Sequence, residues 1–317
     1  MAKRGLLDFI VGRIPGLKGE DVKKLSFEFD SEGDLAILSQ RDLEAHLGHK
    51  LGYAAWVMAD ICAMAEKDEA AARQRGISIT GIRDGNYPPL VREIFDPPAL
   101  LFYRGKLPSY DKPMAAVVGT RRPSSAAAAQ AYSLGHELGR AGFPVVSGLA
   151  LGIDAMAHRG NIEAGAPTVA VLGSGLDNVY PSSNRGLARR ILEAGGCIFS
   201  EYPPGTKPMK WNFPARNRII SALARGVLIV EAPERSGALI TAGFALEQGR
   251  DLWVASSGVN SRIGRGTAKL AEDGARVINS ARDILDEWGF VNEIPQDDRP
   301  GLALAANLAR SLNIKLC

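Results

Sequence analysis

Cysteine is scarce in this sequence. Cys62, Cys197 and Cys317 are far apart in a chain of 317 residues, and no CxxC pair occurs. An odd number of widely spaced cysteines argues against both a disulfide framework and a zinc site. The chain is therefore expected to work in a reducing compartment, the cytoplasm.

Long apolar runs are also absent. No stretch approaches the roughly 18 consecutive apolar residues that suggest a membrane-spanning helix. The basic and apolar start, residues 1–16, is interrupted by Asp8, and no small-residue cleavage site follows it. It is a poor signal peptide, and we expect no membrane partner.

The familiar enzyme signatures are missing as well. Neither a GxxxxGK[ST] loop nor a GxSxG elbow occurs. The histidines show no metal-ligand spacing; they are His46, His49, His136 and His158. Asp154 and His158 would share one helix face, but Asp154 as an N-cap and His158 as a packing or hydrogen-bonding residue is the simpler interpretation. We therefore expect neither a metal nor a cofactor.

Charge of one sign is not in excess over the whole chain. Lys and Arg number 38 and Asp and Glu 35, which gives a net charge of +3, and 46% of the residues are hydrophobic. These values are ordinary for a globular protein of about two domains. The net charge does not indicate a partner, so local clusters matter more.

The character of the chain changes twice before its middle. Residues 1–75 show apolar spacings of three and four among good helix formers, which predicts a small helical domain. Residues 76–113 are rich in Pro and Gly and are expected to form a connector with short strands. Residues 291–317 form a tail that is too short for a further domain, such as a winged helix.

From Met114 onward, short apolar segments alternate with helical ones. The strand-like segments are MAAVVG, FPVVSG, PTVAVLG, CIFSEY, VLIVEA and DLWVASS. Continuous apolar strands alternating with helices indicate a parallel sheet that is covered on both faces. The expected fold class is α/β: a Rossmann-like, doubly wound, mostly parallel sheet over residues 114–290, preceded by the small helical domain.

Two loops at predicted strand ends have the composition of phosphate cradles. Ligands of such sheets bind beyond the carboxyl ends of the strands. The loop VVGTRRPSS supplies Gly119 for a turn, the cations Arg121 and Arg122, and a helix start that favours an anion. The loop VVSGLALGID exposes backbone at Ser147 and Gly148. Structural turns would explain both loops equally well.

A third loop resembles a dinucleotide fingerprint without completing it. Gly173 and Gly175 follow a strand, but Asn178 occupies the third glycine position. The next helix is expected to begin only near Ser183. A pyrophosphate would not meet a helix N-terminus in the usual way, so a nicotinamide or flavin site is not expected.

A fourth loop contains the stretch KWNFPARNRII. Lys210 and Phe213 precede a helix whose first turn would contain Pro214 and Arg216. A cation beside an exposed ring suits single-stranded nucleic acid, because the cation meets a phosphate while a base stacks on the ring. The alternative is that Trp211 and Phe213 pin the loop to the core. The stretch by itself does not decide between the two.

Two acidic residues follow predicted strands. Glu201 and Glu231 could form a catalytic carboxylate pair. A buried acid that is neutralised by Arg216 or Arg218 is the simpler interpretation.

Taken together, these loops resemble the DNA-processing protein A (DprA/Smf) family. The segments that carry the resemblance are DGNYPPLVREIFDPPALLFYRG, VVGTRRPSS, SGLALGIDAMAHRG, TVAVLGSGLDNVYPSSN, SEYPPGTKP, FPARNRIISALARGVLIVEA and SGALITAGFALEQGRD. Each is weak alone, but seven in order with matching spacing are highly specific. They cover residues 84–251 almost without gaps.

The resemblance implies a non-enzymatic protein that binds single-stranded DNA, protects incoming strands in natural transformation and helps to load the recombinase RecA. It implies a homodimer as well. Mapped onto this sequence, the family's basic pocket would use Arg121, Ser147–Gly148, Lys210, Phe213 and Arg216, which coincide with the candidates found from the loops. Trp211 and Arg218 are then expected to be mainly structural.

The sequence departs from the family pattern at three places. Thr120 stands where Ser is usual, which keeps a small hydroxyl. Residues 256–270 have Ser257, Thr267 and Lys269 in place of the usual Pro-Gly and Gly-x-Asn-x-Leu-Ile pattern, which puts a binding or dimer role of this segment in doubt. The tail has no room for the winged-helix domain of many members.

Two other functional classes remain open at this stage. Similar sheets host nucleotide- or nucleoside-phosphate hydrolases, in which Glu201 or Glu231 would act as acid or base. A purely structural interaction protein is the third possibility.

Overall fold

The structure, a computed structural model, describes residues 6–52, 54–290 and 293. No helix in these ranges is long and apolar enough to cross a membrane. The predicted tail, residues 291–317, lies outside the described residues except for Glu293. The chain divides into two units, which are described separately. The smaller comprises the described part of Met1–Arg104 with Ser174–Asn178 and Ser200–Lys207; the larger comprises Gly105–Gly173, Val179–Phe199 and the described part of Pro208–Cys317.

The smaller unit is mainly helical, as its sequence predicts. Its elements are α1 (Leu7–Val11), α2 (Asp21–Glu28), α3 (Glu32–Ala36), α4 (Gln40–Leu47), α5 (Met58–Gln74), β1 (Ser78–Gly81), α6 (Pro89–Glu93) and β2 (Leu100–Gly105). Helix α4 shows why helices form here: Ser39 and Asp42 make a capping box at its start. At its end Gly48 adopts the left-handed conformation, with φ of 77°. Strands β1 and β2 pair in antiparallel fashion, with Ser78 opposite Tyr103.

The larger unit alternates strands and helices. Its elements are β3 (Ala115–Val118), α7 (Ser125–Arg140), β4 (Val145–Ser147), α8 (Ile153–Glu163), β5 (Val169–Leu172), the short helix η1 (Ser182–Asn184), α9 (Arg185–Glu193), β6 (Cys197–Ser200), α10 (Asn212–Leu223), β7 (Gly226–Ile229), α11 (Gly237–Glu247), β8 (Asp251–Ala255), α12 (Ser256–Val259), α13 (Arg265–Glu272), β9 (Arg276–Ile278) and α14 (Ala281–Glu287). The boundaries agree with the sequence signals: Ser124 caps α7, and the helix after β5 begins late, as expected.

The strand order of this unit is β6-β5-β4-β3-β7-β8-β9. The pairs β3–β4, β4–β5, β3–β7, β7–β8 and β8–β9 are all parallel. From β3 the chain runs outward through β4, β5 and β6, then returns to β7 on the other side of β3. The predicted Rossmann-like, doubly wound sheet is confirmed. The order in which the chain adds strands to the sheet reverses between β3 and β7. Folds of this class form a ligand crevice at such a point.

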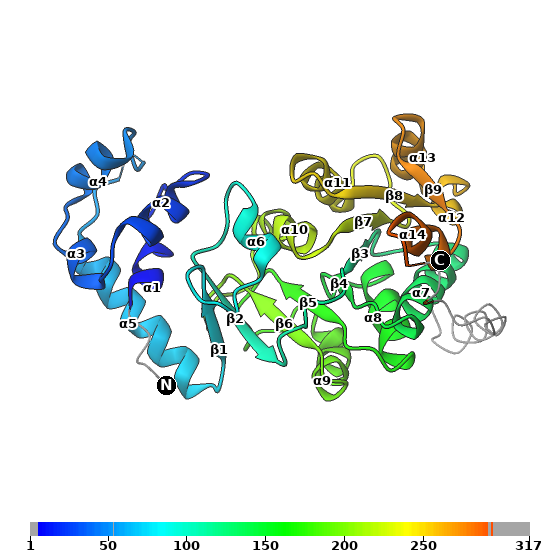
Figure 1. Cartoon of the computed structure of the whole chain (residues 1–317), viewed down its shortest axis with the longest axis horizontal. Helices are drawn as coiled ribbons and strands as arrows, with labels where there is room; N and C mark the ends of the chain where they lie inside the picture. Colours follow the sequence, from blue (N-terminus) through cyan, green and yellow to red (C-terminus); the bar gives the residue numbers. More distant parts are fainter. Residues whose placement is uncertain (1–5, 53, 291–292, 294–317) are drawn as a thin grey trace. The chain divides into compact units, whose positions relative to one another are not determined.

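Helices cover both faces of this sheet (Figure 1). Helices α7, α8 and α9 pack together on one face, and α10 and α11 pack together on the other. The β3, β4, β5 and β7 strands are buried throughout, which explains their continuous apolar sequences. On the α7 side the core includes Trp253 and Trp288, whose ring centroids are 5.5 Å apart in an edge-to-face contact. This rigid scaffold fixes the loops at the strand ends.

Candidate functional site

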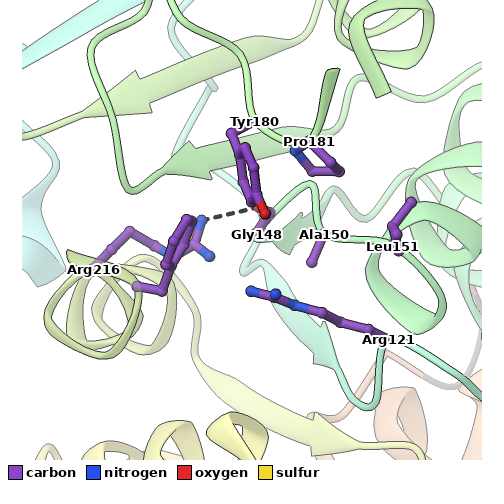
Figure 2. A pocket seen from close by; sticks show the side chains of 8 residues that line it. Arg121, Gly148, Ala150, Leu151, Tyr180, Pro181 and Arg216 are labelled. Atoms are coloured by element: carbon purple, nitrogen blue, oxygen red, sulfur yellow. Dashed lines mark hydrogen bonds between the residues drawn. The ribbon is translucent and has the colours of Figure 1, made fainter. Parts of the chain in front are cut away.

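A small hollow lies at the carboxyl edge of the sheet. Because the strands are parallel, the loops that follow β3, β4 and β5 and the start of α10 all meet there. The hollow has a volume of about 40 Å³. Its lining residues are Arg121, Gly148, Ala150, Leu151, Tyr180, Pro181, Phe213 and Arg216. Figure 2 shows Arg121 reaching in opposite Tyr180 and Pro181, with Arg216 to one side.

Arg121, Phe213 and Tyr180 form a cationic and aromatic group in this hollow. The guanidinium carbon of Arg121 lies 5.5 Å from the centroid of the Phe213 ring, within cation–π range. The rings of Tyr180 and Phe213 are also 5.5 Å apart and tilted by 43°. Arg121 is exposed and Phe213 is half-buried. A planar apolar ring is therefore offered beside a free positive charge.

Arg216 lies in the wall of the hollow and is almost fully buried, with 5% of its surface exposed. Its Nη1 donates to the carbonyl oxygen of Gly148 at 3.0 Å and also to that of Val171. Figure 2 draws the bond to Gly148. The sequence presented Arg216 as a cation at the start of a helix, and the structure adds that this guanidinium ties the ends of β4 and β5 together.

The loop after β4 is held from several sides. The carboxylate of Asp154 accepts from the backbone N–H of Gly148 at 3.1 Å and from that of Ala150 at 3.4 Å. Asn184 Nδ2 donates to the carbonyl oxygens of Leu149 and Ala150. Leu149 has a positive φ of 54°, a conformation that costs energy for a non-glycine residue. Such strain persists only where surrounding contacts impose it, so the loop is a fixed surface.

The prediction that Asp154 caps a helix is wrong. The N-cap of α8 is Gly152, and the Asp154 side chain serves the preceding loop instead. Burial raises the pKa of the Asp154 carboxyl, and the positive charge of Arg216 opposes this rise. Gly152 has φ of 75°, and a Cβ there would lie 2.4 Å from the carbonyl oxygen of Thr120. Glycine at this position therefore lets the first loop pack on the second.

His158 is a hydrogen-bonded core residue, as the sequence predicted. It is fully buried, and its Nδ1 lies 2.8 Å from the hydroxyl of Thr168. That hydroxyl donates to the carbonyl of Val145, so Nδ1 of the imidazole is the donor to its oxygen. Burial, with a further contribution from the charge of Arg216, lowers the pKa of His158 to about 3. No group of three or more potential metal ligands occurs in the described parts of the chain.

Gly119 and Ser147 support the hollow without lining it. A Cβ on Gly119 would lie 2.6 Å from Ile153 and 2.9 Å from the carbonyl oxygen of Glu231. Ser147 is fully buried and donates its hydroxyl hydrogen to the carbonyl oxygen of Val117 at 2.7 Å. These two residues fix the ends of β3 and β4 rather than present side chains to a ligand.

The two acidic candidates belong to different units. Glu231 is fully buried, and its carboxylate accepts from the backbone N–H and the hydroxyl of Ser124 at 2.7 and 2.8 Å. Glu231 therefore anchors the start of α7. The sequence predicted that Arg216 or Arg218 would neutralise a buried acid, but the donors to this carboxylate are the amide and the hydroxyl of Ser124. Glu201 belongs to the smaller unit.

The remaining candidates lie around the hollow. Arg122 and Lys210 are exposed and are not among the lining residues. Trp211 was expected to be mainly structural, but 67% of its surface is exposed, so that prediction is wrong. Arg218 lies on α10, where its Nη1 donates to the carbonyl of Ala215 at 3.1 Å.

Sequence reasoning thus found four lining residues and missed four. Those found are Arg121, Gly148, Phe213 and Arg216; those missed are Ala150, Leu151, Tyr180 and Pro181. The missed ones stand inside the quoted motifs, but they are apolar or aromatic and were not singled out. The available signal was the Tyr180-Pro181 pair in the long loop between β5 and the late helix start at Ser182.

Known proteins match both the sequence and the fold. The family model described as DNA recombination-mediator protein A matches residues 78–289. The DNA processing protein DprA of Bacillus subtilis is 42% identical over 219 residues, which is 69% of this chain and 73% of that protein.

Two solved structures extend the comparison. The DNA processing protein A of Streptococcus pneumoniae aligns with a TM-score of 0.76 and 33% identity, over 90% of this chain and 99% of that one. The DNA processing protein A of Helicobacter pylori, whose description concerns its single-stranded DNA binding mode, aligns with a TM-score of 0.60 and 30% identity, over 67% and 95%. The family model covers most of this chain, including every loop that lines the hollow. The chain therefore belongs to the DNA recombination-mediator protein A family.

Proposed function

We propose that the hollow at the carboxyl edge of the sheet binds single-stranded DNA. The observation that carries the proposal is the placement of Arg121 at 5.5 Å from the Phe213 ring, in a recess that Tyr180 also lines. Arg121 would neutralise a phosphate while a base contacts the half-buried ring. The Helicobacter pylori relative, which is described by its single-stranded DNA binding, supports this assignment.

The shape of the site favours a single strand over a duplex. The Phe213 ring lies in a recess of about 40 Å³ rather than on an open face. Bases in a duplex are stacked and paired, so one would have to be unstacked to reach such a ring, at a cost of a few kcal/mol. A single strand does not bear this cost. Lys210, exposed and two residues from Asn212 at the start of α10, and Arg122 would contact phosphates at the rim.

The proposal extends to the cellular task. The chain would protect incoming strands during natural transformation and help to load RecA, in the cytoplasm and as a homodimer. The description of its family as recombination mediators supports this task. We infer further that the protein acts by binding rather than catalysis. Supporting this, the Glu231 carboxylate is fully engaged by Ser124 and is not exposed to a substrate.

A titration with labelled oligo-dT, set against a duplex of equal length at several salt concentrations, tests the proposal. The single strand should bind more tightly, and log K should fall with log salt by about 0.7 for each phosphate neutralised. Equal affinity for the duplex, or an affinity that salt leaves unchanged, would refute it. Incubation with a panel of nucleotides, followed by assays for released base or phosphate, tests the competing hydrolase function.

A further inference from the structure

A group of arginines lies on helices α8 and α9, next to the hollow. Residues 155–168 and 178–196, which contain most of α8, all of α9 and the turns that flank them, include four arginines and two glutamates. The acids that adjoin these ranges are Asp154, which is buried, and Asp177, which pairs with Arg75 at 3.2 Å within the smaller unit. The exposed surface of the two helices therefore has an excess of positive charge.

Arg159 is a half-buried cation without an acceptor. It lies on α8 one turn before Glu163, so the two side chains are on the same face of the helix. The Glu163 carboxylate is engaged elsewhere: it accepts from the hydroxyl of Tyr132 at 2.6 Å, and Arg190 of α9 pairs with it at 3.4 Å. Among the described residues, no hydrogen bond or ion pair engages the Arg159 guanidinium. Its donors are therefore available to a ligand.

The surroundings of Arg159 do not relieve its charge. Burial lowers the pKa of Arg159, and the neighbouring charge of Arg190 lowers it further, whereas Glu163 opposes both effects. A guanidinium nevertheless stays protonated in proteins. Two positive charges therefore share one carboxylate where α8 and α9 pack together (Figure 1), and a bound anion would stabilise this arrangement.

Arg185 connects this pair of guanidinium groups to the hollow. It is exposed, and its side chain has no acceptor in the part of the chain that the structure describes. It is the first residue of α9, where the helix dipole favours an anion over a cation, and the first turn of α9 contains no acid. It directly follows Asn184, whose side chain holds the carbonyls of Leu149 and Ala150 in the loop that lines the hollow. Arg190 lies five residues further on, about 7.5 Å along the axis of α9.

We propose that Arg185, Arg190 and Arg159 form a phosphate-binding track on α8 and α9, along which a single strand leaves the hollow. The inference rests on the proposed function of the hollow and adds a direction for the strand: from the Phe213 ring, past Tyr180, to Arg185 and then to the other two arginines. The ligand is the phosphodiester backbone. Helices α8 and α9 contain no Phe, Tyr or Trp, so this track contacts phosphates without regard to base.

The test uses the full chain with Arg159 and Arg185 changed together to Gln. Neither side chain is paired with a carboxylate of the described residues, so no acid there loses a partner. The control changes Arg73 of α5 and Arg282 of α14 to Gln; both are exposed and pair with a carboxylate one turn away. Both variants lose two positive charges, so the general attraction for DNA falls equally.

A third variant changes Arg159 and Arg185 to Lys, which keeps both charges. Wild type and the three variants are titrated with labelled oligo-dT of about 4 and about 16 nucleotides, the range of site sizes known for single-strand-binding folds. Each titration is repeated at several salt concentrations. Thermal unfolding is measured beside it.

We expect the Gln variant of Arg159 and Arg185, but not the control, to lose affinity for the long oligonucleotide. Its salt slope should become shallower by about 1.4, because two phosphate contacts at about 0.7 each are lost. Between 1 M and 0.1 M salt this corresponds to about 25-fold in affinity. Binding of the short oligonucleotide, which occupies the hollow, should change no more than in the control. The Lys variant should keep the slope of wild type.

Equal behaviour of the Gln variant and the control with the long oligonucleotide would overturn the inference. It would leave the proposed function intact, because wild type would still bind the strand. A Lys variant that unfolds like wild type but has the shallow slope of the Gln variant would also overturn the inference, since the loss would not follow the charge. A failure of wild type to bind any single strand would instead refute the proposed function.

Discussion

Replacement of Phe213 by Ala probes the core of the proposed site. The change removes a half-buried ring that faces Arg121 and Tyr180, each about 5.5 Å away. A base that stacks on an aromatic side chain contributes about 1–3 kcal/mol. The dissociation constant for oligo-dT should therefore rise by about 5- to 150-fold. Because no charge is removed, the dependence of log K on log salt should stay as in wild type.

The matched control is Trp211 changed to Ala. Trp211 is two residues away, is 67% exposed and is not among the residues that line the hollow. Both variants lose one aromatic side chain at the start of α10. The measurement is fluorescence anisotropy with labelled oligo-dT at three or more salt concentrations, with thermal unfolding of each variant beside it.

Two results would refute the reasoning. An affinity of the Phe213 variant within about twofold of wild type, with the fold intact, would mean that no base rests on the ring. An equal loss in the Trp211 variant would mean that the exposed loop, and not the hollow, contacts the bases.

Three further predictions follow from the same geometry. Changing Arg121 to Gln should weaken oligo-dT binding and make the salt slope shallower by about 0.7, whereas Arg122 to Gln, with the same loss of charge, should have a smaller effect; equal slopes would contradict this. Changing Gly152 to Ala should destabilise the fold by at least about 1–2 kcal/mol, the cost of a side chain in the left-handed region, because the new Cβ would also meet the carbonyl of Thr120; an unchanged Tm would contradict it. The imidazole of His158, whose pKa is lowered to about 3, stays neutral in the fold, while the unfolded chain takes up a proton below its ordinary pKa of 6.5. Its contribution to stability is complete above pH 6.5 and is lost as pH falls toward 3, by up to about 5 kcal/mol, so urea unfolding of a His158 to Gln variant should depend less on pH in this range.

The order of the elements was readable from the sequence because it depends on neighbouring residues. The apolar run before Gly119 predicts a buried strand, and Ser124 is placed to cap the next helix; the structure has both. The alternation of such segments implies parallel strands, and so a common edge at which their loops meet. Loop composition then indicated Arg121 and Phe213 as separate candidates, and their contact across 92 residues of sequence was found only in the structure.

Burial and strand order were decided only by the tertiary structure. Arg216 and Lys210 are both cations near the start of α10, yet one lies buried on the carbonyls of Gly148 and Val171 and the other is exposed. Trp211 has an apolar side chain, yet 67% of its surface is exposed, because little of the described chain packs over its ring. The adjacency of β3 and β7, at which the strand order reverses, depends on hydrogen bonds between residues more than 100 positions apart, such as that of Thr120 with Glu231. Local propensity carries no information about such contacts, because they form only when the whole sheet is assembled.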